Sequence, residues 1–127
     1  MKRILRLLCV NAYSSRSVQF WSLLVQAART LQVLSYEQVE RMTGIPRFGQ
    51  TQILANILYY CQQQGLPHLT CIVIEQATGM PASDDFQGLD LSAEIRRVFV
   101  HDWLSRGAPQ VADFQAATAA ATTAVTV

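Results

Sequence analysis

The sequence predicts a helix-rich α+β domain, and three observations between Leu34 and Met80 support this prediction. A short helix with a complete capping signal is followed by a Gly and a Pro, and a longer helical stretch ends at a second Gly and Pro. A β-branched, apolar run follows, with the length and composition of a buried strand. Helix, tight turn, helix and strand is the order of a winged helix-turn-helix. We therefore expect a domain of this kind with additional helices at both ends.

The chain is long enough for one compact domain. It has 127 residues, of which 50% are hydrophobic, and a chain of this size buries roughly two-thirds of its unfolded surface. We expect this domain to cover residues 1–115. Residues 116–127 are only Ala, Thr and Val. We expect this uncharged, low-complexity segment to be a tail that is frayed or packed through intermolecular contacts.

The N-terminal part predicts one clear helix. It should begin after Ser17, a suitable capping residue, and run to about Leu31. Apolar residues at helical spacing from Phe20 onward predict its buried face. Before it, Lys2–Val10 is apolar enough for a short helix or a strand, and residues 11–16 have the composition of a turn.

The next helix has the most complete local signal in the chain. Ser35 and Gln38 give the S-x-x-Q pattern of a capping box, and the flanking Leu34 and Val39 can pack across it as a hydrophobic staple. Gly44 is suited to the left-handed position that ends a helix, and the proline two residues later prevents its continuation.

The second helix of the pair should cover about Gln50–Gln64 and end at Gly65. Leu69–Glu75 is the predicted strand, and a turn and a loop from Met80 to Gly88 follow where a wing would lie. Apolar residues at helical spacing predict the buried side of the helix. They are Ile53, Leu54, Ile57, Leu58 and Cys61.

A last long helix is expected from Leu91 to about Ser105, with Asp90 as its cap. Its core side should include Val98 and Leu104, with a tryptophan nearby. A short helical turn around residues 110–114 can follow.

The candidate binding surface lies on the second helix and at its start. Amide and hydroxyl side chains there are of the types that read base edges, and an amide can bind adenine through two hydrogen bonds. The arginine before the helix can contact phosphate, and the tyrosine suits a protein interface. These residues are Arg47, Gln50, Thr51, Gln52, Asn56 and Tyr59.

The charge of the chain leaves two kinds of partner open. Charged residues are 15% of the sequence, the net charge is +1, and residues 48–70 contain no Lys, Arg, Asp or Glu. Proteins that hold DNA through its phosphates usually carry a basic excess. We therefore expect a non-catalytic module that contacts DNA or a DNA-associated protein complex. The alternative is a small protein-interaction module, such as an inhibitor, immunity factor or adaptor, without nucleic-acid contact.

Cysteine, histidine and acidic residues predict neither a metal site nor a cofactor. Cys9, Cys61 and Cys71 lie among apolar residues, without CxxC or zinc-type spacing. Free, reduced thiols favour a cytoplasmic protein, and no apolar run has the length needed for a membrane span. His68 and His101 lack neighbouring nucleophiles in the sequence, so we expect structural roles for them and no catalytic residue.

Two segments resemble the C-terminal domain of the alkylguanine DNA alkyltransferase family. SYEQVERMTGIP is similar to the family's TYGQVA-type helix start, and LTCIVIEQATG resembles its PCHRVV segment. The resemblance implies a winged helix, with Cys71 at the alkyl-accepting position and Gln50–Gln64 as the DNA-reading helix. Thr70, Ile72 and Val73 stand where the family has Pro, His and Arg. The resemblance therefore predicts the fold and not the reaction.

Overall fold

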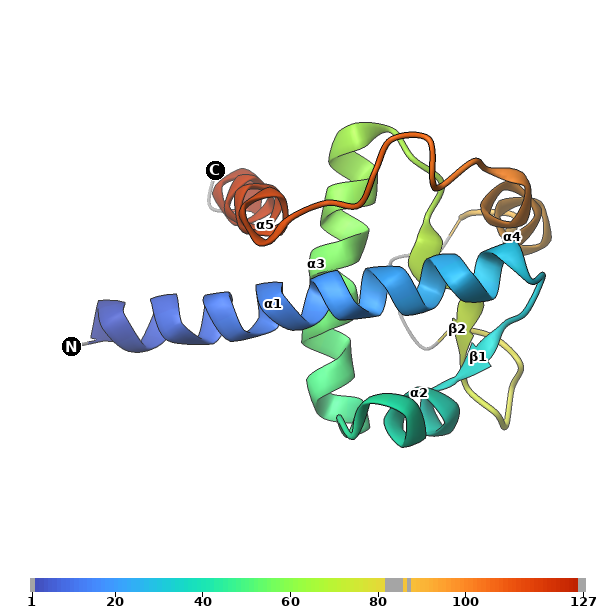
Figure 1. Ribbon diagram of the computed structural model, residues 1–127, viewed down its shortest axis with the longest axis horizontal. Helices are drawn as coiled ribbons and strands as arrows, with labels where there is room; N and C mark the ends of the chain where they lie inside the picture. The colour runs from blue at the N-terminus through green and yellow to red at the C-terminus, as the bar shows by residue number, and fades with distance from the viewer. Residues whose placement is uncertain (1, 82–85, 87, 126–127) are drawn as a thin grey trace.

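The computed structural model describes residues 2–81, 86 and 88–125, with side chains described from residue 15 to residue 120 within these ranges. The protein is a helix-rich α+β domain in which the long helices cross one another and a small sheet lies at one side (Figure 1). Its elements in chain order are α1 (Lys2–Arg29), β1 (Leu34–Ser35), α2 (Tyr36–Thr43), α3 (Arg47–Gln64), a 3-10 helix (Leu69–Ile72), β2 (Val73–Ile74), α4 (Leu91–Val100) and α5 (Val111–Val125).

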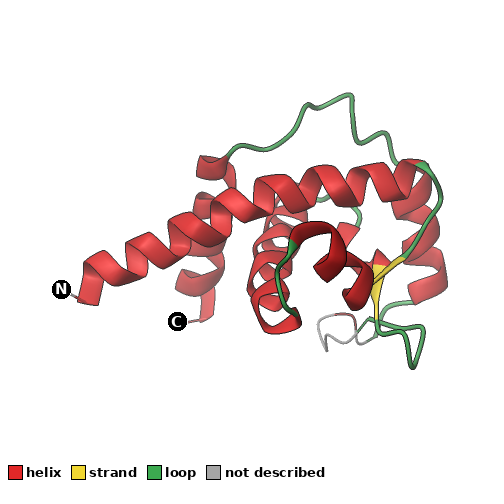
Figure 2. Ribbon diagram, turned by 60° about the horizontal axis from the view of Figure 1, so that its bottom comes forward, coloured by secondary structure: helices red, strands yellow, loops and turns green. Residues whose placement is uncertain are grey.

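The N-terminal region forms one continuous helix, α1, so the predicted turn at residues 11–16 is wrong. The sequence of α1 contains no Gly or Pro, and short polar residues alone do not end a helix. Ser17 is not its cap. It is fully buried within α1, and its hydroxyl donates a hydrogen bond to the Ile53 carbonyl at 3.3 Å. The first turns of α1 extend beyond the other elements (Figures 1 and 2).

The capping box of α2 is confirmed. The Gln38 backbone N–H donates to Ser35 Oγ at 3.1 Å, and the Ser35 N–H donates to Gln38 Oε1 at 2.8 Å. Leu34 and Val39, the expected staple residues, are both buried in the core. Gly44 ends α2 with a φ of 75°, and its N–H donates to the Glu40 carbonyl.

Replacing Ser35 by alanine should lower the free energy of unfolding by about 0.5–2 kcal/mol, because the Gln38 N–H would lose its acceptor. Urea denaturation measures the change. The matched control is Ser92→Ala, at an exposed position in the first turn of α4, where we expect little change. Equal midpoints for the Ser35 variant and the wild type would contradict this energetic role of the cap.

The helix α3 begins at Arg47 and not at Gln50, because Pro46 takes the cap position and its carbonyl accepts from the Gln50 N–H. The helix ends as expected at Gly65, which has a φ of 68°. The predicted buried stripe is confirmed, since all five of its apolar residues are buried.

The predicted strand Leu69–Glu75 is mostly wrong. Leu69–Ile72 is a 3-10 helix, and only Val73–Ile74 is a strand. This strand pairs in parallel with β1, in the register Leu34 to Val73. All four residues of the 3-10 helix are buried. The apolar run therefore indicates that the segment is buried, but not whether it is a strand. Periodicity alone does not distinguish a buried strand from a buried helical turn.

The described sheet does not confirm the winged helix. A wing is a β-hairpin beside the helix pair, whereas the described residues contain a single two-stranded parallel sheet, formed by β1 and β2 (Figure 2). The predicted wing loop lies in part outside the described residues, at positions 82–85 and 87. The helix-rich α+β class is therefore confirmed, and the winged helix remains an expectation.

Asp90 caps α4 as predicted, with its side chain accepting from the Ala93 N–H at 3.3 Å. The helix ends at Val100 instead of continuing to Ser105. Beyond it, the buried Trp103 donates its indole N–H to the Val98 carbonyl at 2.8 Å. Leu104 is exposed, contrary to the expectation that it faces the core.

The expected tail is helical as far as Val125, because α5 continues from Val111 through the Ala- and Thr-rich segment. Alanine has the highest helix propensity, and its small side chain lets helices approach closely. Phe114 and Ala117 of α5 are buried. The helix packs against α1 and α3, so this segment contributes to the domain.

An aromatic cluster fills the junction between the helices. Trp21 of α1 contacts Tyr60 of α3 and Trp103 edge to face, each with ring centroids 5.5 Å apart. Phe114 of α5 completes the cluster, with its ring centroid 5.5 Å from that of Tyr60. Edge-to-face pairs of this kind contribute beyond the apolar area that they bury.

Candidate functional site

The helices α2 and α3 form a helix-turn-helix pair joined by the three residues 44–46 (Figure 1). The left-handed Gly44 makes the short connection possible, because residues with a side chain rarely adopt that backbone conformation. The pair presents the surface on which the sequence predicted partner contacts. The predicted contact residues have different surroundings in the structure.

Two of the predicted contact residues are not on the surface. Gln50 is fully buried, and its amide N–H group donates to the Tyr36 carbonyl at 3.0 Å and to the Ile45 carbonyl at 2.9 Å. Gln50 therefore ties α3 to α2 and to the turn. Asn56 is buried between helices, donating to Ser17 Oγ of α1 at 3.4 Å and accepting from Thr118 Oγ1 of α5 at 2.8 Å.

Gln50 and Asn56 were predicted to be exposed because their side chains are polar. The helix α3 is covered on more than one side, since it packs against α1, α5 and the 3-10 helix. A wide buried face must include some polar positions. An amide tolerates burial there when neighbouring groups supply its hydrogen bonds. Both ends of the Asn56 amide have such partners, whereas Gln50 has them at its nitrogen and its Oε1 has none among the described residues.

Arg47 is exposed, but its guanidinium is already engaged. It forms an ion pair with Glu75 and lies over the Tyr36 ring, with the guanidinium carbon 4.6 Å from the ring centroid. The hydrogen bond to Glu75 raises the pKa of Arg47 above its ordinary value. The Glu75 carboxylate thus offsets the positive charge of Arg47, which was predicted to contact phosphate.

Thr51 and Gln52 are exposed as predicted, and both line a cavity of about 240 Å³ beside α3. Tyr59, the sixth predicted residue, is half-buried. We call this space the α3 cavity. Its described lining comes from α2, α3, the 3-10 helix and the loop after β2, and contains no Lys, Arg, Asp, Glu or His. The residues are Tyr36, Thr51, Gln52, Leu54, Ala55, Leu58, Thr70, Pro81 and Phe86.

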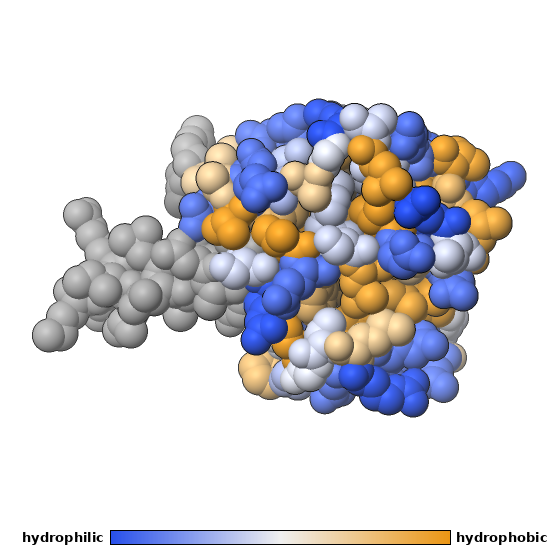
Figure 3. All heavy atoms as spheres, viewed as in Figure 1, coloured by the Kyte–Doolittle hydropathy of each residue, from blue (hydrophilic) through white to orange (hydrophobic). Residues whose placement is uncertain are grey.

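Two large apolar side chains are exposed near this cavity. Phe48 is 80% exposed and precedes Thr51 and Gln52 by three and four residues, which places it on the same face of α3. Met80, which is 52% exposed, precedes the lining residue Pro81. Other large apolar side chains, such as Val100 and Leu31, are also exposed, and polar and apolar side chains both reach the face seen in Figure 3.

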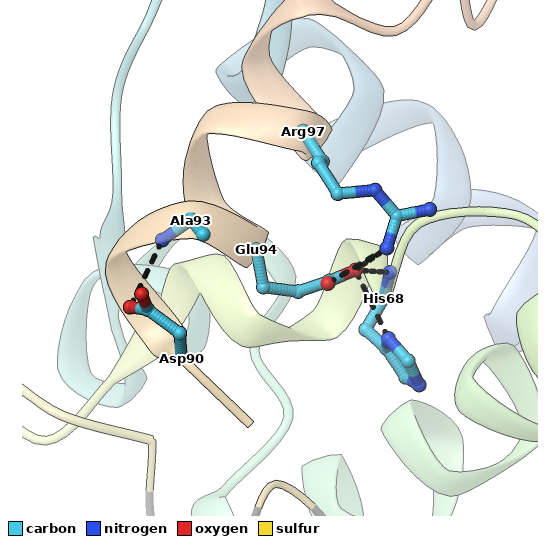
Figure 4. Close-up of polar contacts among 5 residues, drawn as sticks. All are labelled: His68, Asp90, Ala93, Glu94 and Arg97. Carbon is cyan, nitrogen blue, oxygen red and sulfur yellow. Dashed lines mark hydrogen bonds and ion pairs between the residues drawn. The ribbon is translucent and has the colours of Figure 1, made fainter.

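A buried carboxylate, that of Glu94, is held by His68 and Arg97 (Figure 4). Glu94 of α4 accepts hydrogen bonds from the backbone N–H and the ring Nδ1 of His68, both at 3.0 Å. Arg97 donates to the same carboxylate at 2.9 Å. The His68 ring in turn packs edge to face against Phe86, a lining residue, with the ring centroids 6.0 Å apart.

The pKa of Glu94 lies below its ordinary value. Burial by itself raises the pKa, but the hydrogen bonds from the backbone and ring of His68 and the charge of Arg97 outweigh it. From the sequence, a structural role was expected for His68, but no role was predicted for Glu94. Its only signal was an acidic residue one helical turn after the cap of α4, a common position for a solvated carboxylate.

Cys61 and Cys71 are fully buried, and burial raises the pKa of each thiol to about 12. A thiolate is the reactive form of cysteine, so both are poor nucleophiles at neutral pH. Cys71, which the resemblance placed at an alkyl-accepting position, is not among the described lining residues of the α3 cavity. The side chain of Cys9 lies outside the described part of the chain.

We expect Cys61 and Cys71 to react with a polar disulfide reagent only as fast as the protein opens or unfolds. A Cys9→Ser background removes the third thiol, and the absorbance of the released thiolate follows the reaction at neutral pH. The same protein in urea supplies the rate for accessible thiols. Complete labelling of Cys71 within seconds in the native protein would contradict its burial.

No protein-family model matches the chain, and no similar protein was found among curated proteins or solved structures. Within residues 2–81, 86 and 88–125, no three or more His, Cys, Asp or Glu side chains are grouped as a metal site would require. In the same ranges, no helix combines the length and apolar character of a membrane span. The function therefore has to be inferred from the surface around α3.

Proposed function

We propose that the protein is a non-catalytic binding module whose α2–α3 surface contacts a protein partner. This partner can belong to a DNA-associated protein complex. The observation that carries this proposal is the α3 cavity, which has an uncharged described lining and an exposed phenylalanine on the same helix face. Exposed aromatic side chains beside a pocket are typical of the centres of protein interfaces.

The charges around α3 favour protein over DNA. Residues 48–70 contain no Lys, Arg, Asp or Glu, and Arg47 at the start of α3 is paired with Glu75. The helix α2 adds Glu37 and Glu40 against a single Arg41. Phosphate contacts need cations near the helix that enters the groove, since those contacts supply most of the affinity.

Direct DNA contact is the second candidate, and the geometry of the helix pair favours it. A short helix, a three-residue turn with glycine and a longer second helix is the arrangement that places a recognition helix in the major groove. Thr51 and Gln52 on the first turns of α3 would be the side chains able to reach base edges.

A photo-crosslinking amino acid at position 52 would distinguish the two candidates in the native cell. The control position is Gln62, which is exposed near the other end of α3. We expect position 52, and not position 62, to capture a protein. Crosslinks only to nucleic acid would contradict the proposal.

The captured protein should then be purified and its affinity measured by calorimetry. We expect Phe48→Ala to weaken binding by about 10-fold or more, with Gln62→Ala near wild type. Changing the salt from roughly 50 to 200 mM should alter the affinity only slightly, whereas phosphate-based binding weakens steeply over that range. An unchanged affinity of the Phe48 variant would contradict the proposal.

A further inference from the structure

We infer that the α3 cavity receives one neutral aromatic side chain of the partner protein, and that this side chain carries a hydrogen-bond donor, as indole and phenol do. This inference rests on the proposed function. It adds the chemical class of the group that the partner inserts.

The size of the cavity sets the size of the group. Its volume is about 240 Å³, whereas an engineered protein cavity of ~150 Å³ holds one benzene molecule. The α3 cavity therefore has room for a substituted ring or for two fused rings. A methyl or isopropyl group would leave much of the cavity unfilled. It would therefore make fewer van der Waals contacts with the lining and bind more weakly.

The described lining favours a neutral group. Leu54, Leu58, Pro81 and Phe86 give apolar walls, and none of the described lining residues carries a charge. Against these residues, a lysine or carboxylate would lose its hydration without gaining a counter-charge. Phe86 also offers an aromatic ring for an edge-to-face contact.

The lining also contains polar groups that suit a donor. Thr70 is only 5% exposed, and its Oγ1 has no hydrogen-bond partner in the described part of the chain. The Thr51 hydroxyl already donates to the Phe48 carbonyl at 2.8 Å, so its oxygen is left to accept. An N–H or O–H on the inserted ring would find an acceptor.

The exposed side chains beside the cavity identify the source of the ring as a protein. Phe48 and Met80 extend the apolar surface on two sides, from α3 and from the loop after β2. A free small molecule confined to the cavity would leave both uncovered. A peptide segment that inserts its aromatic side chain would cover them as it crosses the surface.

The test uses the ¹⁵N-labelled 127-residue protein and three blocked amino acids as probes: N-acetyltryptophanamide, N-acetylphenylalaninamide and N-acetyllysinamide. We expect the tryptophan probe to shift the amide signals of Thr51, Gln52, Thr70 and Phe86, and the lysine probe to leave them unchanged. Ala55→Leu, which fills the cavity from α3, should abolish the shifts. 9-Methyladenine tests the nucleobase as an alternative neutral aromatic group.

Thr70→Val separates the hydrogen bond from the shape of the cavity. The variant should bind the tryptophan probe about 5-fold more weakly, which corresponds to one hydrogen bond. It should bind the phenylalanine probe, which has no donor on its ring, as the wild type does. The amide spectrum of each variant confirms that it is folded before any titration.

Three results would overturn the inference: no shifts at these amides, equal shifts with the lysine probe, or tighter binding of 9-methyladenine than of the tryptophan probe. The proposed function fails by a different result, which is an unchanged partner affinity for Phe48→Ala. If Phe48→Ala weakens the partner while the probes leave the cavity signals unchanged, the binding function stands and the aromatic insertion is wrong.

Discussion

Replacing Gln50 by alanine should lower the free energy of unfolding by about 2–4 kcal/mol, one of the two largest effects that we expect from a single substitution in this protein. Gln50 is fully buried and donates to two carbonyl groups, those of Tyr36 and Ile45. The alanine variant would leave a cavity at the junction of α2 and α3 and would remove the donor that both carbonyls share.

The matched control is Gln52→Ala, on the same helix but exposed, where the change should stay below about 0.5 kcal/mol. Urea denaturation followed by circular dichroism measures both. Gln50→Met keeps most of the volume but lacks the amide, so it reports the hydrogen bonds with little cavity. Equal effects at positions 50 and 52 would show that the hydrogen bonds of Gln50 do not stabilise the junction of α2, the turn and α3.

Replacing Glu94 by alanine should lower the free energy of unfolding by about 2–3 kcal/mol at neutral pH. Removing one member of a buried, hydrogen-bonded charge cluster has large effects, but Arg97 is mostly exposed here and its share is screened by solvent. The loss would come mainly from the two N–H groups of His68, which would lose their acceptor. Glu40→Ala, at an exposed position in α2, is the control.

The pH dependence of stability provides a second measurement on the same residue. Because folding lowers the pKa of Glu94, its carboxylate stabilises the folded state above the ordinary value of 4.5. That contribution should be lost as the pH falls through the lower pKa of the folded state. We therefore expect the wild type to lose more stability than Glu94→Ala as the pH falls below about 4.5. Parallel curves for the two proteins would contradict the lowered pKa.

The features that could be predicted from the sequence are those fixed by a few neighbouring residues. The capping box at Ser35 and the Asp90 cap depend on side chains that reach backbone groups three residues away. Gly44 and Gly65 have the left-handed backbone that their positions suggested. The buried stripe of α3 follows from helical periodicity within one element.

The features that could not be predicted depend on contacts between distant segments. Whether Gln50 and Asn56 lie inside was decided by α1, α2 and α5 closing around α3. The 3-10 helix at Leu69–Ile72 has the composition of a strand. The partner strand β1 has two residues, which pair with Val73 and Ile74, so β2 is equally short.

The candidate site was predicted only in part for the same reason. Thr51 and Gln52 were placed correctly on the surface, because α3 and its buried stripe were known. The α3 cavity itself is formed by residues from Tyr36 to Phe86, which meet only in the folded chain. The pairing of Arg47 with Glu75 likewise joins the start of α3 to the segment after β2.

The buried hydrogen bonds between α1, α3 and α5 have a consequence for how α5 finds its place. Phe114 anchors the start of α5 in the aromatic cluster. The described residues after it are small or medium-sized, so their apolar contacts alone would fix the alignment of a turn, about 5.4 Å of helix, only weakly. The bond from Thr118 to Asn56, which continues to Ser17, can form in only one alignment. A single buried Asn selects the alignment of a coiled coil in the same way. Phe114 thus holds the first turn of α5 by apolar contact, while the hydrogen bonds that link Thr118 to Asn56 and Asn56 to Ser17 fix the alignment of the next turn.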